Sequence, residues 1–165
     1  MSSLVIRPFV PADEQGVVDV ILPIQREEFG LAITADDQPD LRAVPAFYQT
    51  GSGEFLIAEF DGRIVGTIAM KDIGRKMGAL RKMFVTAEFR GREFGVAQAL
   101  LARLLECSRA AGMREVYLGT TDRFLAAHRF YEKHGFRLID VADLPASFPR
   151  MAVDTRFYAL ELASG

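Results

Sequence analysis

Residues 80–105 read LRKMFVTAEFRGREFGVAQALLARLL, and this stretch decides the expected fold. Residues 80–85 form a short, mostly apolar run without helical spacing, which is typical of a strand buried on both faces. After a loop, apolar residues recur at the three- and four-residue spacing of an amphipathic helix: Val96, Ala97, Leu100, Leu101, Leu104 and Leu105. The stretch therefore predicts a strand, a short loop and a long helix.

The loop between that strand and that helix carries two arginines and two glycines, Arg90, Arg92, Gly91 and Gly95. At a helix N-terminus, unpaired backbone N–H groups and the positive end of the helix dipole favour a phosphate or pyrophosphate. The GxGxxG pattern of dinucleotide-binding folds and the GKS or GKT of a P-loop are both absent. A tight turn with solvated arginines accounts for these residues equally well, so the segment alone leaves both interpretations open.

Length and composition restrict the class of protein. The 165 residues suit a single domain, residues 1–165, and the net charge of −2 argues against a general affinity for nucleic acid or for anionic membranes. The first residues, MSSLVIRPF, lack the features of a secretory signal, and no run approaches the roughly 20 apolar residues that span a bilayer. The single cysteine, Cys107, excludes an internal disulfide and a thiolate metal cluster. We expect a cytoplasmic protein with neither a nucleic-acid nor a membrane partner.

The rest of the chain alternates strands and helices. A hairpin is expected at Asp61-Gly62, between two strand-like runs. The expected strands cover residues 4–9, 55–60, 64–70, 80–85, 116–121, 136–141 and 156–162. A first helix is expected to start near Asp13, with a kink or division at Pro23, and a second, short helix to end near Tyr48. Two more helices are expected over residues 96–111 and 123–134, the last capped by Thr121 or Asp122. This order predicts an α/β fold with antiparallel strands first and a parallel crossover in the second half.

This order of elements, together with RGREFGVA at residues 90–97 and AAHRFYEKHGF at residues 126–136, resembles the GNAT superfamily of acetyl-CoA-dependent N-acetyltransferases. The first motif is similar to the family's pyrophosphate-binding loop, and the second to its later helix. The resemblance implies a mixed, mostly antiparallel sheet with flanking helices. The fourth and fifth strands, over residues 80–85 and 116–121, would be parallel neighbours that splay apart.

The resemblance also implies acetyl-CoA as cosubstrate. No metal is expected, because two histidines without a third soft ligand near them make a poor metal site. Met83 and Val85 would offer backbone groups to the pantetheine, and the amides of residues 90–96 would bind the pyrophosphate. The residues implied in cofactor binding are Met83, Phe84, Val85, Arg90, Gly91, Arg92, Glu93, Phe94, Gly95, Val96, Ala97, Ala127 and Tyr131. Two residues depart from the family pattern. Glu93 replaces the first glycine of the loop, and Phe124 replaces an asparagine that often contacts the pantetheine arm.

The implied reaction is attack by a neutral amine on the thioester carbonyl. Tyr131 matches the tyrosine that protonates the leaving thiolate in many relatives, although a packed core aromatic would also explain it. For the proton acceptor, Glu28 is the candidate. Its competitors are Glu27, Asp36, Asp37 and Asp40, and a solvated acidic face explains any of these residues as well. If Arg81 or Lys82 faces the pocket, the acceptor is expected to carry a carboxylate.

The leading hypothesis is an N-acetyltransferase that moves an acetyl group from acetyl-CoA to a primary amine of a small molecule or peptide. A catalytically weak acyl-CoA-binding sensor or regulatory protein is the alternative, because the fourth strand lacks an acid and the loop carries Glu93. A generic nucleotide-binding module is a third hypothesis, against which the absent fingerprints argue. The sequence leaves the acceptor unnamed and a homodimer open.

Overall fold

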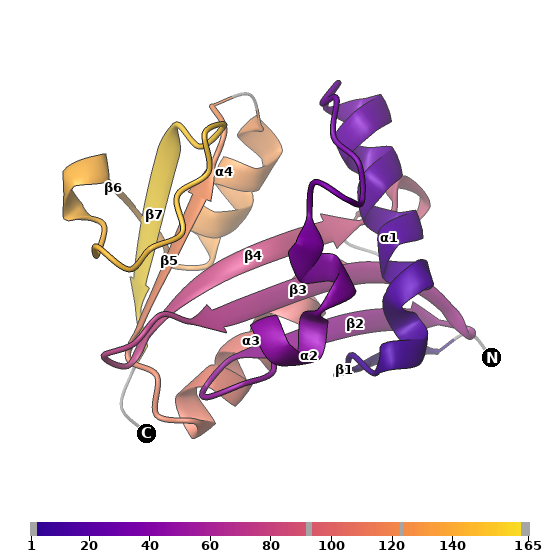
Figure 1. The fold of residues 1–165 in the computed structure, drawn as a ribbon, viewed down its shortest axis with the longest axis horizontal. Coiled ribbons are helices and arrows are strands. Elements are labelled where there is room, and N and C mark those ends of the chain that lie inside the picture. Colours follow the sequence, from indigo (N-terminus) through magenta and orange to yellow (C-terminus); the bar gives the residue numbers. More distant parts are fainter. Residues whose placement is uncertain (1–2, 92–93, 123, 163–165) are drawn as a thin grey trace.

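The computed structural model describes residues 3–91, 94–122 and 124–162, which form a mixed sheet with helices on both faces (Figure 1). Among these residues the sheet has seven strands in the order β1-β2-β3-β4-β5-β7-β6. The strands are β1 (Leu4–Pro8), β2 (Glu54–Phe60), β3 (Arg63–Asp72), β4 (Met77–Val85), β5 (Glu115–Thr120), β6 (Arg137–Ile139) and β7 (Arg156–Glu161). All neighbouring pairs are antiparallel except β4 and β5, so the predicted mixed α/β sheet is confirmed.

The α-helices are α1 (Glu14–Pro23), α2 (Val44–Phe47), α3 (Val96–Ala110) and α4 (Leu125–Lys133). Helices α1 and α2 cover one face of β2–β4, where Val17 and Ile21 pack on Phe55 and Ile57. Helix α3 covers the other face with the predicted stripe, in which Val96, Leu100, Leu101, Leu104 and Leu105 are all buried. Strands between two helical layers bury both faces, which explains their long apolar runs.

Strands β4 and β5 pair over a short length and then diverge (Figure 1). Their parallel register contains only Met77 with Glu115, Gly78 with Val116, and Ala79 with Tyr117. Beyond Ala79 the edge of β4 that faces β5 therefore has no strand to pair with among the described residues. This divergence opens the sheet near its centre.

A β-bulge lies in β4 just beyond the point of divergence. Thr67 of β3 pairs with Phe84 and Ala69 with Arg81, so β4 carries one extra residue between them. Lys82 adopts a left-handed conformation with φ of 57°, and its carbonyl accepts a hydrogen bond of 2.7 Å from the Thr67 hydroxyl. The bulge changes the direction in which the side chains of Arg81 and Lys82 leave the strand.

Several local predictions need correction. The second half of β4 is not buried on both faces, because residues 81–84 are half-buried along the opening between β4 and β5. The N-cap of α4 is Phe124 rather than Thr121 or Asp122, and the helix starts at Leu125. Strand β6 covers three residues instead of the expected six. The prediction for Pro23 is confirmed: α1 ends there, and a π-helical turn (Ile24–Glu28) follows.

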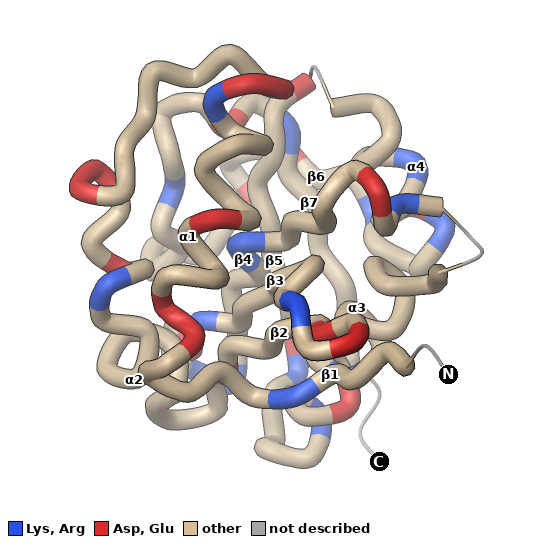
Figure 2. The backbone as a smooth tube through the Cα atoms, turned by 90° about the vertical axis from the view of Figure 1, so that its right-hand side faces the viewer, with Lys and Arg blue, Asp and Glu red and all other residues tan. Residues whose placement is uncertain are grey.

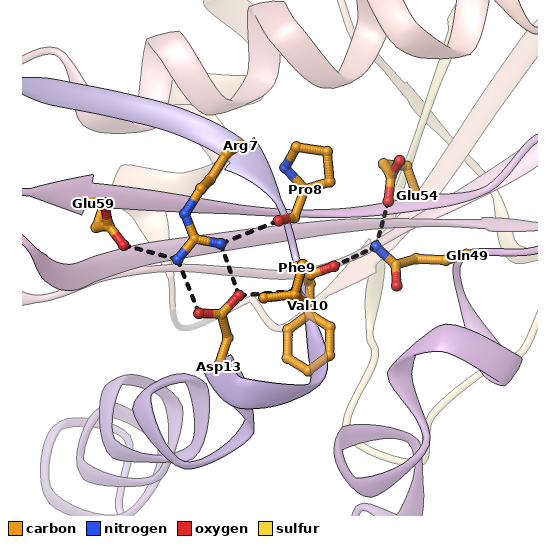
Figure 3. Close-up of polar contacts among 8 residues, drawn as sticks. All are labelled: Arg7, Pro8, Phe9, Val10, Asp13, Gln49, Glu54 and Glu59. Atoms are coloured by element: carbon orange, nitrogen blue, oxygen red, sulfur yellow. Dashed lines mark hydrogen bonds and ion pairs between the residues drawn. The ribbon is translucent and has the colours of Figure 1, made fainter.

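A polar cluster fixes the start of α1 to the outer strands (Figure 3). The Arg7 guanidinium donates hydrogen bonds of 2.8 and 2.9 Å to the Asp13 carboxylate and one of 2.7 Å to Glu59. Asp13 Oδ2 also accepts the Val10 N–H at 2.9 Å. The hydrogen bonds from Arg7 hold the pKa of Asp13 below its usual range. This cluster orients α1, whose C-terminal end leads to the site.

Charged residues of both signs alternate along the chain, and Figure 2 shows no large region of one sign in its view. No helix in the described part of the chain is long and apolar enough to cross a lipid bilayer.

Candidate active site

A cleft of about 940 Å³ occupies the opening between β4 and β5. Its walls come from segments that are distant in the sequence: the turn after α1, the second half of β4, the end of β5, the first residues of α4 and the loop over residues 148–154. The cleft has two ends. The Val85 and Arg90 end leads toward the N-terminus of α3, and the other end contains Arg81, Lys82 and Asp154.

The first end is lined by residues that the sequence analysis predicted for the pantetheine arm. Met83, Phe84 and Val85 line the cleft from β4, and Ala127 and Tyr131 line it from α4. Because β4 lacks a partner on this edge, its backbone groups can pair with an extended ligand in the manner of an added strand. The residues present therefore fit the amide-bearing pantetheine chain of coenzyme A.

Tyr131 is buried, with 6% of its surface exposed, and yet it lines the cleft. Its hydroxyl makes no hydrogen bond to any described residue, while every fully buried side-chain polar atom in this part of the chain has a partner. The hydroxyl therefore opens into the cleft. Burial raises the pKa of Tyr131 above its ordinary value of 10, so the phenol is protonated at neutral pH and able to donate.

The turn that leads into α3 has the open backbone expected for a phosphate site. Gly91 has a φ of 119°, and a Cβ there would meet no atom of the described residues within 4 Å. Gly95, with a φ of 62°, is the N-cap of the 15-residue α3 and supplies no side-chain cap. The first amides of the helix are therefore available to an anion. Arg92 and Glu93, which the sequence places in the same loop, lie outside the described residues.

Three further predicted cofactor residues, in this turn and at the start of α3, have side chains that face the protein interior. Phe94 packs against Phe60 and Phe89 with ring centroids 6.0 and 5.1 Å away. Val96 is 1% exposed, and Ala97 packs on the same core. Only the main-chain amides of these predicted cofactor residues can reach a phosphate, which is how the resemblance implies that the pyrophosphate is bound.

Arg90 is engaged by an acid from the other side of the cleft. Its two Nη atoms donate to both carboxylate oxygens of Glu28 at 2.6 and 2.9 Å, and its Nε donates to the Val85 carbonyl at 2.8 Å. Beside this ion pair, Phe29 stacks on Phe124 with ring centroids 3.8 Å apart. The turn after α1 thus contacts both the α3 turn and the start of α4. Glu28 is not among the residues that line the cleft; it lies beside Arg90, with both of its oxygens already bonded.

The opposite end of the cleft holds a buried polar network. Lys82 Nζ donates to Gln38 Oε1 at 2.7 Å and lies 3.6 Å from Asp40 Oδ2, which also accepts the Tyr48 hydroxyl at 2.6 Å. The amides of Gln38 and Gln25 are bonded reciprocally. Burial lowers the pKa of Lys82, while the nearby Asp40 carboxylate opposes that shift. Asp40 is therefore a counterion to Lys82 and is occupied.

Arg81 and Asp154 are differently placed. Arg81 Nη2 lies 3.7 Å from the Met151 sulfur, and no carboxylate of the described residues is within 4.0 Å of its guanidinium. Asp154 is half-buried in the cleft wall, and no Lys, Arg or His nitrogen of the described residues lies within 4.0 Å of its carboxylate. The acceptor end therefore presents one cation and one carboxylate, neither of which has an ionic partner in the described chain.

The other acids that the sequence analysis named as candidate proton acceptors are bonded to other groups or lie outside the cleft. Asp36 is exposed and pairs with Arg42 at 3.2 Å. Asp37 lines the cleft but is bonded to the backbone and hydroxyl of Thr34. Glu27 is exposed outside the cleft. Sequence reasoning did not find Asp154, because it stands in an irregular loop where neither periodicity nor a motif draws attention to it.

A cleft between two diverging parallel strands, with a glycine-bearing turn into a helix beside it, is the arrangement that the resemblance to the GNAT superfamily predicts. Residues 19–136 match the model of the Acetyltransferase (GNAT) family, and the chain belongs to this family.

Solved structures share the whole fold. An acetyltransferase of the GNAT family from Staphylococcus aureus Mu50 superposes with a TM-score of 0.92 at 36% identity, covering 98% of this chain and 100% of that one. An acetyltransferase from Streptococcus agalactiae gives a TM-score of 0.90 at 28% identity, covering 96% and 98%. The N-acetylglutamate synthase of Neisseria gonorrhoeae, solved with coenzyme A and N-acetylglutamate, shares the fold at 18% identity and a TM-score of 0.76, covering 98% of this chain and 35% of that one.

Curated relatives match over part of their length. N-acetylaspartate synthetase of Danio rerio is 35% identical over 102 residues, which are 61% of this chain and 36% of that protein. N-acetyltransferase family 8 member 2 of Rattus norvegicus is 31% identical over 105 residues, 61% of this chain and 46% of that protein. The chain thus spans between a third and a half of the length of these relatives.

Proposed function

We propose that the protein is an acetyl-CoA-dependent N-acetyltransferase whose acceptor is a primary amine that carries a carboxylate. The prediction of the acceptor class rests on the position of Arg81. It is a guanidinium in the wall of the cleft without a carboxylate partner in the described chain. Arginine binds carboxylates through two parallel hydrogen bonds, which gives both affinity and orientation. The similarity to the N-acetylaspartate synthetase of Danio rerio supports the same acceptor class.

Coenzyme A would be held by main chain at the first end of the cleft. The free edge of β4 over Met83–Val85 would pair with the pantetheine, and the first amides of α3 would bind the pyrophosphate. Ala127 would pack on the cofactor, with a side chain small enough for close approach. The thioester would then lie between β4 and Tyr131.

Acetyl transfer requires three groups around the thioester: the amine, a donor to the leaving sulfur, and an acceptor for the amine proton. Tyr131 is proposed as the donor, because its hydroxyl is protonated, open to the cleft and free of other hydrogen bonds to described residues. Glu28 stays a prediction for the proton acceptor. Its bidentate bond to Arg90 occupies both carboxylate oxygens, which opposes that role.

The alternative is an acyl-CoA-binding sensor without turnover. The Glu28–Arg90 ion pair favours it, since the arginine expected at the phosphates is engaged elsewhere. Both hypotheses predict that coenzyme A raises the melting temperature. Only the enzyme hypothesis predicts that free coenzyme A is released when an amine is added to the acetyl-CoA complex.

The acceptor class is tested with paired amines. Aspartate, glutamate and other α-amino acids would be compared with the corresponding amines that lack the α-carboxylate, following thiol release from acetyl-CoA. We expect kcat/KM to be at least about 10-fold higher for the amino acids, as for a charge-assisted hydrogen bond. Equal rates for both members of each pair would overturn the carboxylate-bearing acceptor. Absence of turnover with every amine, together with coenzyme A binding, would support the sensor.

A further inference from the structure

Asp154 is a carboxylate held in the wall of the cleft by its own loop. Its Oδ2 accepts the Met151 N–H at 3.1 Å, and its own N–H donates to the Met151 carbonyl at 3.1 Å. The next residue, Thr155, donates its N–H to the Thr120 carbonyl at 2.9 Å and so ties the loop to the end of β5. The position of Asp154 is therefore fixed by backbone hydrogen bonds on both sides.

The carboxylate packs directly over β5 where this strand diverges from β4. A Cβ added at Gly119 would lie 2.6 Å from Asp154 Oδ2 and 2.8 Å from its Cγ. Both residues line the cleft. Glycine at this position of β5 is thus what leaves room for the carboxylate at the opening of the sheet.

Asp154 can bind a cationic group of a ligand, because no charged group of the described residues forms an ion pair with it. The charged groups that act on it are Arg81 on β4 and Arg150 in its own loop, and neither lies within 4.0 Å. Burial raises the pKa of Asp154, while the Met151 N–H and the two arginines oppose that shift. A carboxylate with a raised pKa is a stronger base than an exposed one, and here no cation of the described residues covers it.

Resting on the proposed function, we infer that Asp154 binds the amino group of the acceptor and takes its proton during acetyl transfer. The N–C bond forms as the amine nitrogen attacks the thioester carbonyl, and the C–S bond breaks. The amine proton passes to Asp154, and the Tyr131 hydroxyl protonates the sulfur. Water then returns the proton from Asp154 to Tyr131, so that amine and thioester give amide and thiol with no proton gained or lost.

This role also explains why Arg81 and Asp154 both line one end of the cleft without forming an ion pair with each other. An α-amino acid presents an amino group and a carboxylate on the same carbon, and the site presents a carboxylate and a guanidinium that lack ionic partners in the described chain. Arg81 would hold the substrate carboxylate while Asp154 faces the amino group. A simple alkylamine would satisfy only Asp154.

The test compares Asp154→Asn with Asp143→Asn, a control in an exposed position of the same connection between β6 and β7. We expect Asp154→Asn to lower kcat by about 10²-fold, the usual contribution of a general base, and Asp143→Asn to leave it unchanged. The pH profile separates a base from a structural residue. In the wild type kcat should be level from neutral pH upward. In Asp154→Asn it should climb through the alkaline range, because the amine then loses its proton without help.

Two further variants guard against a folding defect. Asp154→Glu should restore part of kcat, and Gly119→Ala should lower it, since the new Cβ displaces the carboxylate. The melting-temperature shift produced by coenzyme A should be the same in all variants. If the wild type acetylates amino acids and Asp154→Asn keeps both kcat and its pH profile, the role of Asp154 is wrong and the proposed function stands. A wild type that acetylates no amine overturns both.

Discussion

The Arg90 guanidinium forms a two-point ion pair with the Glu28 carboxylate, with N···O distances of 2.6 and 2.9 Å. The pair joins the turn after β4 to the turn after α1. Both side chains are substantially exposed, 42% for Arg90 and 36% for Glu28, so the pair contributes little to stability, in the range of about 0–1 kcal/mol. A pyrophosphate carries more charge than one carboxylate, and the arginine can therefore exchange its partner when coenzyme A binds.

The first prediction concerns this exchange. Glu28→Gln should free Arg90 for the cofactor and tighten coenzyme A binding by about 2- to 5-fold, because the competing ion pair is worth at most about 1 kcal/mol. Isothermal titration calorimetry with coenzyme A measures the effect, and the exposed neighbour Glu27→Gln is the control. If Glu28 instead acts as the proton acceptor, kcat will fall by about 10²-fold while coenzyme A affinity stays the same.

The second prediction isolates the Tyr131 hydroxyl. Tyr131→Phe should reduce kcat by about 10²-fold, since the leaving thiolate loses its proton donor. Coenzyme A binding and the melting temperature should change little, because the hydroxyl bonds to none of the described residues. Tyr117→Phe, which removes a hydroxyl bonded to Glu115 outside the cleft, serves as the control. Wild-type turnover in Tyr131→Phe would leave Tyr131 as a packing residue only.

The third prediction isolates Arg81. Arg81→Gln should raise KM for a carboxylate-bearing acceptor by about 10- to 100-fold, since one charge-assisted contact of roughly 1.5–3 kcal/mol is lost. The rate with an amine that lacks a carboxylate should hardly change. Steady-state kinetics with a matched pair of acceptors provides the measurement. An equal loss for both acceptors would mean that Arg81 shapes the cleft without recognising the substrate.

The fourth prediction concerns stability at the other end of α1. Asp13→Asn should lower the free energy of unfolding by about 1–3 kcal/mol at neutral pH, because Asp13 is almost fully buried and accepts the charged Arg7 side chain. Urea unfolding measures this loss, and the exposed Asp19→Asn should change stability by less than about 0.5 kcal/mol.

The ion pair of Arg7 with Asp13 also determines how the stability difference between the wild type and Asp13→Asn depends on pH. The pKa of Asp13 is lowered in the folded protein from 3.8, so its contribution is fully present above that value and disappears as the pH falls through the lower folded pKa. The wild type and Asp13→Asn should therefore begin to converge in stability below about pH 4 and become equal only below the folded pKa of Asp13. A difference that stays constant down to pH 2 would show that the ion pair is not its source.

The sequence predicted the strand, turn and helix over residues 80–105 because local patterns determine them. The apolar stripe of α3 and the glycines of its turn are visible in a single window. Asp61-Gly62 likewise predicted its hairpin, and both residues have the positive φ that such a turn needs. The order of the elements then sufficed to identify the mixed sheet.

The acceptor end resisted prediction because tertiary contacts build it. Lys82, which faces Gln38 and Asp40, lies at a bulge in β4, and the extra residue of a bulge leaves no mark in the apolar pattern. Phe124 was expected only to lack a polar contact, whereas it stacks on Phe29 from a segment almost a hundred residues away. Asp154 reaches the cleft through a long irregular loop.

The two ends of the cleft differ in whether main-chain or side-chain groups are proposed to bind the ligand. The contacts proposed for the cofactor are largely main chain, which most side-chain replacements leave in place, while those proposed for the acceptor are side chains of β4 and the 148–154 loop. Exchange of residues 148–153, with Asp154 kept, should therefore redirect the protein toward new amines without loss of its acetyl donor, and the scaffold offers a starting point for the directed evolution of amide-forming catalysts.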